Sequence, residues 1–205
     1  TLTEAEILNK LSDSNPESRK IAGKSLSKIL KDNSRLFGMI LNVISRDKYV
    51  EDSKRGFGSI LESRNLDNDI ENKVVDSLVS TVSKKMPDLT HKYYKWKAKV
   101  FKKKKLDWWD RNAPLNHSEN TLIKWDDAKD IVLEAFNDFN PKISKIAKQF
   151  FDNNWIDAEP RKGKASGAFA HPSVPSHHPY ILMNYQGKVR DVMTLAHELG
   201  HGVHQ

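Results

Sequence analysis

The sequence predicts a mainly α-helical protein with a small antiparallel β element, and three observations support this prediction. Apolar residues recur at helical spacing from Thr3 to Phe101 and again from Asp126 to Asn153. The short run Pro179–Tyr185, which is followed by Gln186-Gly187, is the best candidate for a strand. Apolar residues around the motif at 197–201 again have helical spacing, so one more helix is expected after the strand.

Residues 1–115 are predicted to form a helical region with short breaks. Asn15 followed by Pro16 is typical of an N-cap and a first helical residue. Further apolar stripes repeat with a period of about 3.6 residues, as on helices that bury one face. Met86-Pro87-Asp88 is expected to interrupt this pattern, because an internal proline removes a backbone N–H and crowds the preceding turn.

A second region, residues 116–205, is predicted to begin in the polar loop 116–120. Two helices come first. The small residues around 166–170 then allow another backbone to approach closely, either a partner strand or an extended peptide. This stretch and 180–185 are expected to form the β element, next to the last helix. A strand in that place can hold a peptide by main-chain hydrogen bonds.

Composition excludes several classes of protein. Cysteine is absent, which excludes disulfides and thiolate metal sites and fits a reducing compartment, so we predict a cytoplasmic location. No apolar run approaches the roughly 20 residues of a membrane span, and no membrane partner is expected. The N-terminus has neither a methionine nor the layout of a signal peptide, as in a processed or excised piece.

The chain has a net charge of +7, and most of its basic residues are interspersed with acidic ones. One segment, however, carries a dense run of lysines. The dense block Lys102–Lys105 follows Lys95, Lys97 and Lys99. Cations suit the C-terminal end of a helix, so the block is interpreted as a solvated helix end. A basic nucleic-acid-binding module is the less favoured alternative, and it would bind RNA or DNA in a salt-dependent way.

The pattern His-Glu-x-x-His predicts a zinc-binding helix. Side chains four residues apart lie on the same face of a helix, so His197 and His201 can both reach one metal ion. Glu198 lies about 100° further around the helix. There it borders the metal rather than binding it, which suits a base that acts on water.

The residues around the motif support this helix. Asp191 is expected to be its N-cap, and apolar residues from Val192 to Val203 give it a side to bury. Gly200 and Gly202 each cost roughly 1 kcal/mol relative to alanine inside a helix. Two such glycines indicate that something packs closely there.

Three stretches of the chain carry a specific resemblance. They are Gly163-Lys-Ala-Ser-Gly-Ala-Phe169, Pro179-Tyr-Ile-Leu-Met-Asn-Tyr185 and Thr194-Leu-Ala-His-Glu-Leu-Gly-His201. They resemble oligoendopeptidase F, of the thimet-oligopeptidase-like zinc metallopeptidases. Weaker similarity covers much of the upstream chain, for example at Trp155-Ile-Asp157.

The resemblance implies a mainly helical, zincin-like catalytic core in which a small sheet beside the active-site helix lines a deep channel. It also implies zinc-dependent cleavage of short peptides rather than of folded proteins, because the channel limits access. By matching position, His197 and His201 would be zinc ligands and Glu198 the general base. The stretch Gly167-Ala168-Phe169 would lie along the substrate backbone.

The family also carries parts that this chain does not match. A third zinc ligand, a glutamate, lies on a later helix, and histidine and tyrosine residues beyond it stabilise the oxyanion. Residues 116–205 would therefore be the N-terminal part of the catalytic core, truncated at the active-site helix. A non-catalytic fragment that binds metal weakly is accordingly the alternative to an active zinc peptidase.

The remaining histidines are not expected to complete the zinc site. His204 follows His197 by seven residues, which advance a helix by about 10.5 Å. That is too far for both to reach one ion at about 2.1 Å. His177 and His178 are expected to be solvent-facing or structural rather than ligands.

Overall fold

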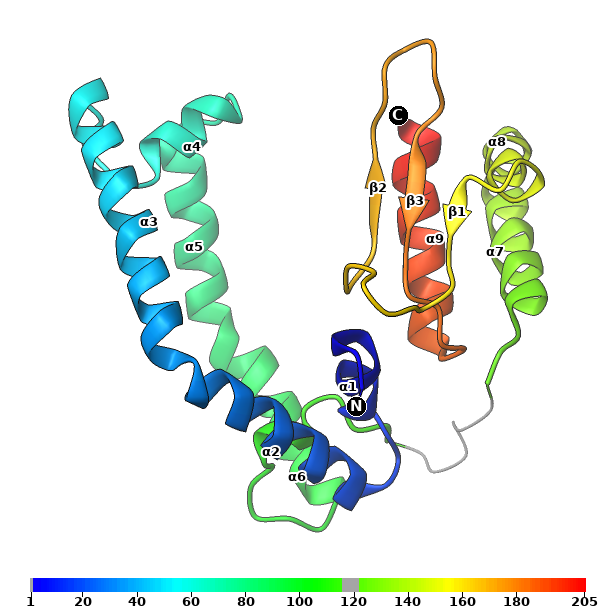
Figure 1. The fold of residues 1–205 in the computed structure, drawn as a ribbon, viewed down its shortest axis with the longest axis horizontal. Coiled ribbons are helices and arrows are strands. Elements are labelled where there is room, and N and C mark those ends of the chain that lie inside the picture. Colours follow the sequence, from blue (N-terminus) through cyan, green and yellow to red (C-terminus); the bar gives the residue numbers. More distant parts are fainter. Residues whose placement is uncertain (1, 116–121) are drawn as a thin grey trace. The chain divides into compact units, whose positions relative to one another are not determined.

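The computed structural model describes residues 2–115 and 122–205 of the 205-residue chain (Figure 1). The chain divides into two compact units: Thr1–Ala22 with Asn112–Gln205, called the site unit, and Gly23–Arg111, called the helical unit. The polar loop expected at 116–120 lies outside the described residues. The region boundary expected near residue 115 stays a prediction.

The helical unit consists of helices joined by short turns (Figure 1). Its helix α2 begins as predicted, because the backbone N–H of Glu17 donates to Asn15 Oδ1 at 2.9 Å and Pro16 is the first helical residue. The elements are α2 (Pro16–Asp32), which starts in the site unit, α3 (Ser34–Arg55), α4 (Glu62–Asp67), α5 (Asn72–Met86), a π-helical turn (Pro87–His91), α6 (Lys92–Val100) and a 3-10 turn (Trp108–Asp110).

The interruption expected at Met86-Pro87-Asp88 is wrong. Pro87 keeps helical backbone angles, φ −61° and ψ −40°, and the π-helical turn Pro87–His91 joins α5 directly to α6. A π turn bonds residues five apart, so it shifts the hydrogen-bonding pattern at the point where proline lacks an N–H. Helical structure therefore continues from α5 through α6.

Two lysines of the basic segment hold the helical unit together at its end. The Lys97 side chain is buried, and its ammonium donates to the carbonyl of Arg111 at 2.7 Å. Lys103 Nζ lies 2.5 Å from Asp110 Oδ2 and 3.1 Å from Asp107 Oδ2. The hydrogen bond to buried Asp110 raises the pKa of Lys103. Part of the basic block thus has a structural role, and nucleic-acid binding by the rest stays the less favoured alternative.

The site unit places a small sheet against helices (Figure 1). The strand order is β1-β3-β2, with β1 parallel and β2 antiparallel to β3. None of the described helices has both the length and the apolar character needed to cross a bilayer. The elements of the unit besides the start of α2 are α1 (Glu4–Lys10), α7 (Trp125–Phe139), α8 (Pro141–Asp152), β1 (Ile156–Asp157), β2 (Phe169–His171), β3 (Tyr180–Leu182) and α9 (Val189–His204).

The predicted fold class is confirmed. The chain is mainly helical, and a small antiparallel pair forms beside α9. Its strand β2 overlaps the expected stretch 166–170 and ends one residue beyond it, and β3 lies within the expected stretch 180–185. The structure adds β1, a short strand that pairs in parallel with β3 and was not expected as part of the sheet.

The core of the site unit lies where α9 covers one face of the sheet and packs against α7 and α8 (Figure 1). Apolar burial holds these elements together, and it therefore fixes which side of α9 faces inward. The buried core residues are Ala128, Val132, Ala147, Phe150, Ile181, Met183, Val192, Leu195 and Leu199.

Candidate metal centre

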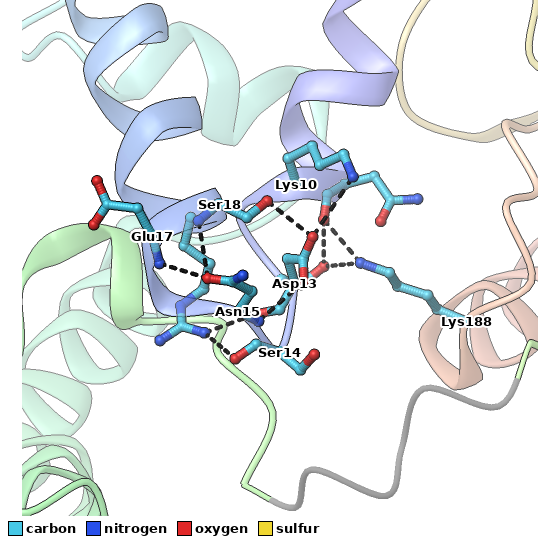
Figure 2. Close-up of polar contacts among 10 residues, drawn as sticks. Lys10, Asp13, Ser14, Asn15, Glu17, Ser18 and Lys188 are labelled. Carbon is cyan, nitrogen blue, oxygen red and sulfur yellow. Dashed lines mark hydrogen bonds and ion pairs between the residues drawn. The ribbon is translucent and has the colours of Figure 1, made fainter.

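The start of α9 is fixed by hydrogen bonds from two sides. The Lys188 ammonium donates to the Asn9 carbonyl at 2.8 Å and to the Ser12 hydroxyl at 2.7 Å, at the end of α1 and just beyond it (Figure 2). Asp191 Oδ2 accepts from the backbone N–H groups of Gln186 at 2.9 Å and of Lys188 at 3.0 Å. Burial lowers the pKa of the Lys188 ammonium.

The prediction that Asp191 is the N-cap of α9 is wrong. The helix begins at Val189 with Lys188 as its N-cap residue, so Asp191 is the third helical residue. Its carboxylate reaches back to the N–H of Lys188, which is the role of the acidic residue in a capping box. An aspartate stabilises a helix start from either position, and the sequence pattern alone did not distinguish the two.

His197 and His201 lie one turn apart on the exposed side of α9. Their Nε2 atoms are 3.1 Å apart, and their ring centroids are 4.7 Å apart with the ring planes at 84°. Two nitrogens that each lie about 2.1 Å from a tetrahedral zinc ion are about 3.4 Å from each other. The two imidazoles therefore converge at close to the spacing that a shared ion requires.

Glu198 occupies the flank of α9 between the histidines and the core. It is 8 % exposed, whereas His197 and His201 are exposed and Leu199 is completely buried. The position follows from the helix itself, because one residue advances the side-chain direction by about 100°. The carboxylate is thus largely shielded from bulk water, beside the imidazole pair in helical position.

In the described part of the chain, no third side chain of a metal-binding type is grouped with His197 and His201. Across residues 2–115 and 122–205, no group of three or more His, Cys, Asp or Glu side chains is arranged to hold a metal. A catalytic zinc uses three protein ligands and keeps one position open. Imidazole nitrogens are common zinc ligands, so His197 and His201 fit this metal as two members of such a set.

The other histidines near the sheet have contacts of their own. His178 stacks on Trp155, with ring centroids 3.6 Å apart and planes 8° apart. His177 is exposed, and its Nδ1 lies 3.0 Å from the Ser176 hydroxyl. Both agree with the expectation of structural or solvent-facing roles. His204 is exposed in the last turn of α9.

The direction of the main-chain groups in β3 follows from its bonds to β1. The N–H of Ile181 donates to the Trp155 carbonyl, and the N–H of Met183 donates to the Asp157 carbonyl, both at 2.9 Å. Successive residues of a strand direct their N–H and C=O groups to opposite edges. The main-chain groups of the alternate residues in β3 therefore face β2.

Strand β2 consequently presents one residue to its outer edge. Leu182 pairs with Phe169 and Tyr180 with His171, so the main chain of these two β2 residues faces β3. The N–H and C=O of Ala170 point the other way, to the edge of the sheet. An extended peptide that adds to this edge would pair with Ala170.

The three residues predicted to lie along a substrate backbone differ in their surroundings. Gly167 has φ +84°, and its carbonyl accepts from the Asn184 amide at 3.0 Å. Ala168 packs against the core, whereas Phe169 is 43 % exposed. Contact of all three with a substrate stays a prediction. Sequence reasoning did not single out Ala170, because its direction depends on the pairing register of β3.

A charged cluster anchors the loop 158–168, which joins β1 to β2. Arg161 donates to both carboxylate oxygens of Asp157, at 2.6 and 2.7 Å. Lys164 Nζ lies 2.9 Å from the same carboxylate. The hydrogen bonds from Arg161, followed by the hydrogen bond from Lys164, lower the pKa of Asp157 from 3.8 to about 2, against the opposing effect of burial.

Replacing Asp157 with asparagine is expected to lower the Tm near neutral pH, because the charge-assisted hydrogen bonds from Arg161 and Lys164 are lost. A carboxyl whose pKa falls on folding stabilises the protein above its unfolded pKa of about 3.9. That stabilisation disappears as the pH falls through the folded pKa of about 2. The Tm difference between native protein and variant should therefore shrink between about pH 4 and about pH 2 in thermal denaturation.

The matched control is Asp152→Asn, which removes an exposed ion pair with Lys148 on α8. Exposed pairs contribute little, so this variant should change the Tm slightly at every pH. A Tm difference for Asp157→Asn that stays constant down to about pH 2 would contradict the low pKa.

Comparison with known proteins connects this geometry to one family. Residues 10–205 match the family described as Peptidase family M3. Oligopeptidase PepF of Bacillus subtilis is 29 % identical over 204 residues, which are 99 % of this chain and 30 % of that protein. An oligoendopeptidase F homolog of Borreliella burgdorferi is 29 % identical over 179 residues, 86 % of this chain and 30 % of that protein.

The fold is also found in a solved structure. PZ peptidase A, solved with an inhibitor, superposes with a TM-score of 0.83 at 20 % identity, over 97 % of this chain and 36 % of that chain. The chain thus spans about a third of the length of the proteins that it matches.

Proposed function

The chain belongs to peptidase family M3, and we propose that the protein hydrolyses short peptides, with zinc held by His197 and His201 and with Glu198 as general base. The observation that carries the proposal is the convergence of the two Nε2 atoms, 3.1 Å apart, on a helix whose intervening residue Glu198 is 8 % exposed. The relatives are named oligopeptidase and oligoendopeptidase, which supports short peptides as substrates.

In the proposed reaction the residues of α9 and β2 have separate tasks. Bound zinc supplies Lewis acidity, which makes water more acidic and polarises the carbonyl of the scissile bond. The Glu198 carboxylate accepts a proton from the attacking water and passes it to the amine of the leaving peptide. The outer edge of β2, at Ala170, orients the substrate main chain by β pairing, and the stretch Gly167-Ala168-Phe169 would lie alongside the substrate backbone.

The proposal extends to the organisation and location of the protein. Residues 116–205 would be the N-terminal part of the catalytic core, with residues 1–115 as a helical region before it. A cytoplasmic location is supported by the cysteine-free composition, which suits a reducing compartment.

For the 205-residue chain by itself we propose a second state, a non-catalytic form that binds zinc weakly. It is favoured by the finding that residues 2–115 and 122–205 contain no third side chain grouped with His197 and His201. A zinc ion with two protein ligands is one ligand short of the three that a catalytic zinc site uses.

Zinc titration tests both parts of the proposal. The natural full-length protein that carries this sequence should lose cleavage of a quenched peptide on chelation and regain it with one equivalent of zinc. In calorimetry the 205-residue chain should bind zinc more weakly than about 1 μM, and His201→Ala should remove the remaining binding. Cleavage that survives complete zinc removal would contradict the zinc mechanism. Sub-micromolar one-to-one binding by the 205-residue chain would contradict the weak-binding form.

A further inference from the structure

We infer that Lys164 and Asn184 are positioning residues, which hold the loop 158–168 so that the outer edge of β2 is correctly placed for a peptide main chain. This inference rests on the proposed function. Neither side chain lies on the outer edge of β2, so both would act through the backbone of the loop and not by touching the substrate.

The buried side chain of Lys164 connects the loop to β1 by hydrogen bonds. Its side chain is only 1 % exposed, and its ammonium donates to three oxygens at 2.9 Å: the carboxylate and the carbonyl of Asp157 and the carbonyl of Glu159. A buried ammonium is costly unless it is paired and hydrogen-bonded. Because each of its three N–H groups has an acceptor, the loop is held in one arrangement around this side chain.

Asn184 ties the other end of the loop to β3. It follows the last residue of β3 by two positions, and its amide nitrogen donates to the carbonyls of Ala165 at 2.9 Å and Gly167 at 3.0 Å. An asparagine amide has two N–H groups, so both are used on this loop. The strand that pairs with β2 therefore also fixes the segment that leads into β2.

The two contacts decide where the edge of β2 begins. The Gly167 carbonyl is already bonded to Asn184, and Phe169 directs its main chain to β3. Ala170 is thus presented outward by a segment whose preceding turn, at Gly167 with φ +84°, is held in place. If the loop moved, the edge would shift relative to α9, and a peptide paired with it would shift as well.

Asn184→Ala tests the inference in the natural full-length protein that carries this sequence. Its KM for a quenched peptide should rise about tenfold while kcat changes by less than about twofold. The reason is that main-chain pairing with the edge of β2 stabilises the bound substrate and the transition state alike. Amide hydrogen exchange at Phe169 and His171, whose N–H groups face β3, should become faster in the same variant.

The matched control is Asn153→Ala. At the end of α8, the Asn153 amide donates the same kind of hydrogen bond to the Gln149 carbonyl at 2.9 Å, and this variant removes it. It should leave KM and the exchange of the β2 amides unchanged. Lys164→Met is a second variant at the other end of the loop, and at a temperature where it stays folded it should also raise KM.

The results separate this inference from the proposed function. An unchanged KM in both Asn184→Ala and Lys164→Met, or a loss that falls on kcat alone, overturns the positioning role. Unchanged exchange in β2 with a raised KM overturns it too, because the residue would then act by another route. Absence of peptide cleavage by the native protein overturns the proposed function itself, and the exchange measurement still reports on the loop.

Discussion

Replacing Glu198 with glutamine is expected to lower kcat for peptide cleavage by about 10²–10⁴-fold while zinc stays bound. Glutamine keeps the shape of the side chain on the buried flank of α9, and it cannot accept a proton from water. The proposed ligands His197 and His201 are unchanged, so the zinc content should equal that of the native protein. The measurement is turnover of a quenched peptide together with metal analysis of the same sample.

A surface glutamate provides the control for this substitution. Glu134 is exposed on α7, and Glu134→Gln removes one negative charge from the same unit without touching the proposed site. Its kcat should match that of the native protein. Turnover within about tenfold of native by a zinc-loaded Glu198→Gln protein would remove Glu198 from the role of general base.

The second large effect is expected on stability, where the two glycines of the motif helix should respond with opposite signs. A Cβ on Gly202 would lie 2.8 Å from Cζ and 2.9 Å from Cε1 of Phe150, a core residue that is 2 % exposed. Overpacking of a core costs about 1–3 kcal/mol, and the gain in helix propensity returns about 1 kcal/mol. Gly202→Ala should therefore lower the free energy of unfolding by up to about 2 kcal/mol.

Gly200→Ala is the matched control for Gly202→Ala. Apart from its chain neighbours and the nearby backbone of α9 itself, no atom of the described residues lies within 4 Å of a Cβ at Gly200. Alanine there should therefore raise the free energy of unfolding by up to about 1 kcal/mol. Denaturant unfolding of the two variants measures both effects. Equal changes in the two variants would mean that the contact with Phe150 does not limit position 202.

The motif could be predicted from the sequence because its geometry is local. The relation between His197 and His201 is set by the helix alone, so a spacing of four residues was enough to bring the two imidazoles together. Glu198 follows from the same periodicity. Close packing was expected at both glycines. It is found at Gly202, against Phe150, whereas no side chain of the described residues packs on Gly200.

The parts that could not be predicted depend on contacts between distant residues. The outward direction of Ala170 is set by the register of β3 and by the bonds from β3 to β1. Asn184 reaches carbonyls 17 and 19 residues earlier in the chain. A polar residue after a strand carries no signal that says which loop it will bind. The error at Pro87 has a different reason. Proline normally ends a helix, but here a π-helical turn accommodates it and the helix continues.

The bond from Lys188 to the Asn9 carbonyl has a consequence for the order of folding. The two residues are 179 positions apart, and contacts of such long range form late, because the entropy of closing a long loop opposes them. During synthesis α1 is made before Lys188, so the bond to Asn9 cannot form until residue 188 has left the ribosome. The first turn of α9 therefore becomes anchored to α1 only after the whole stretch between them has been made, whereas the helical turn that pairs His197 with His201 needs no distant contact and can form as soon as α9 does.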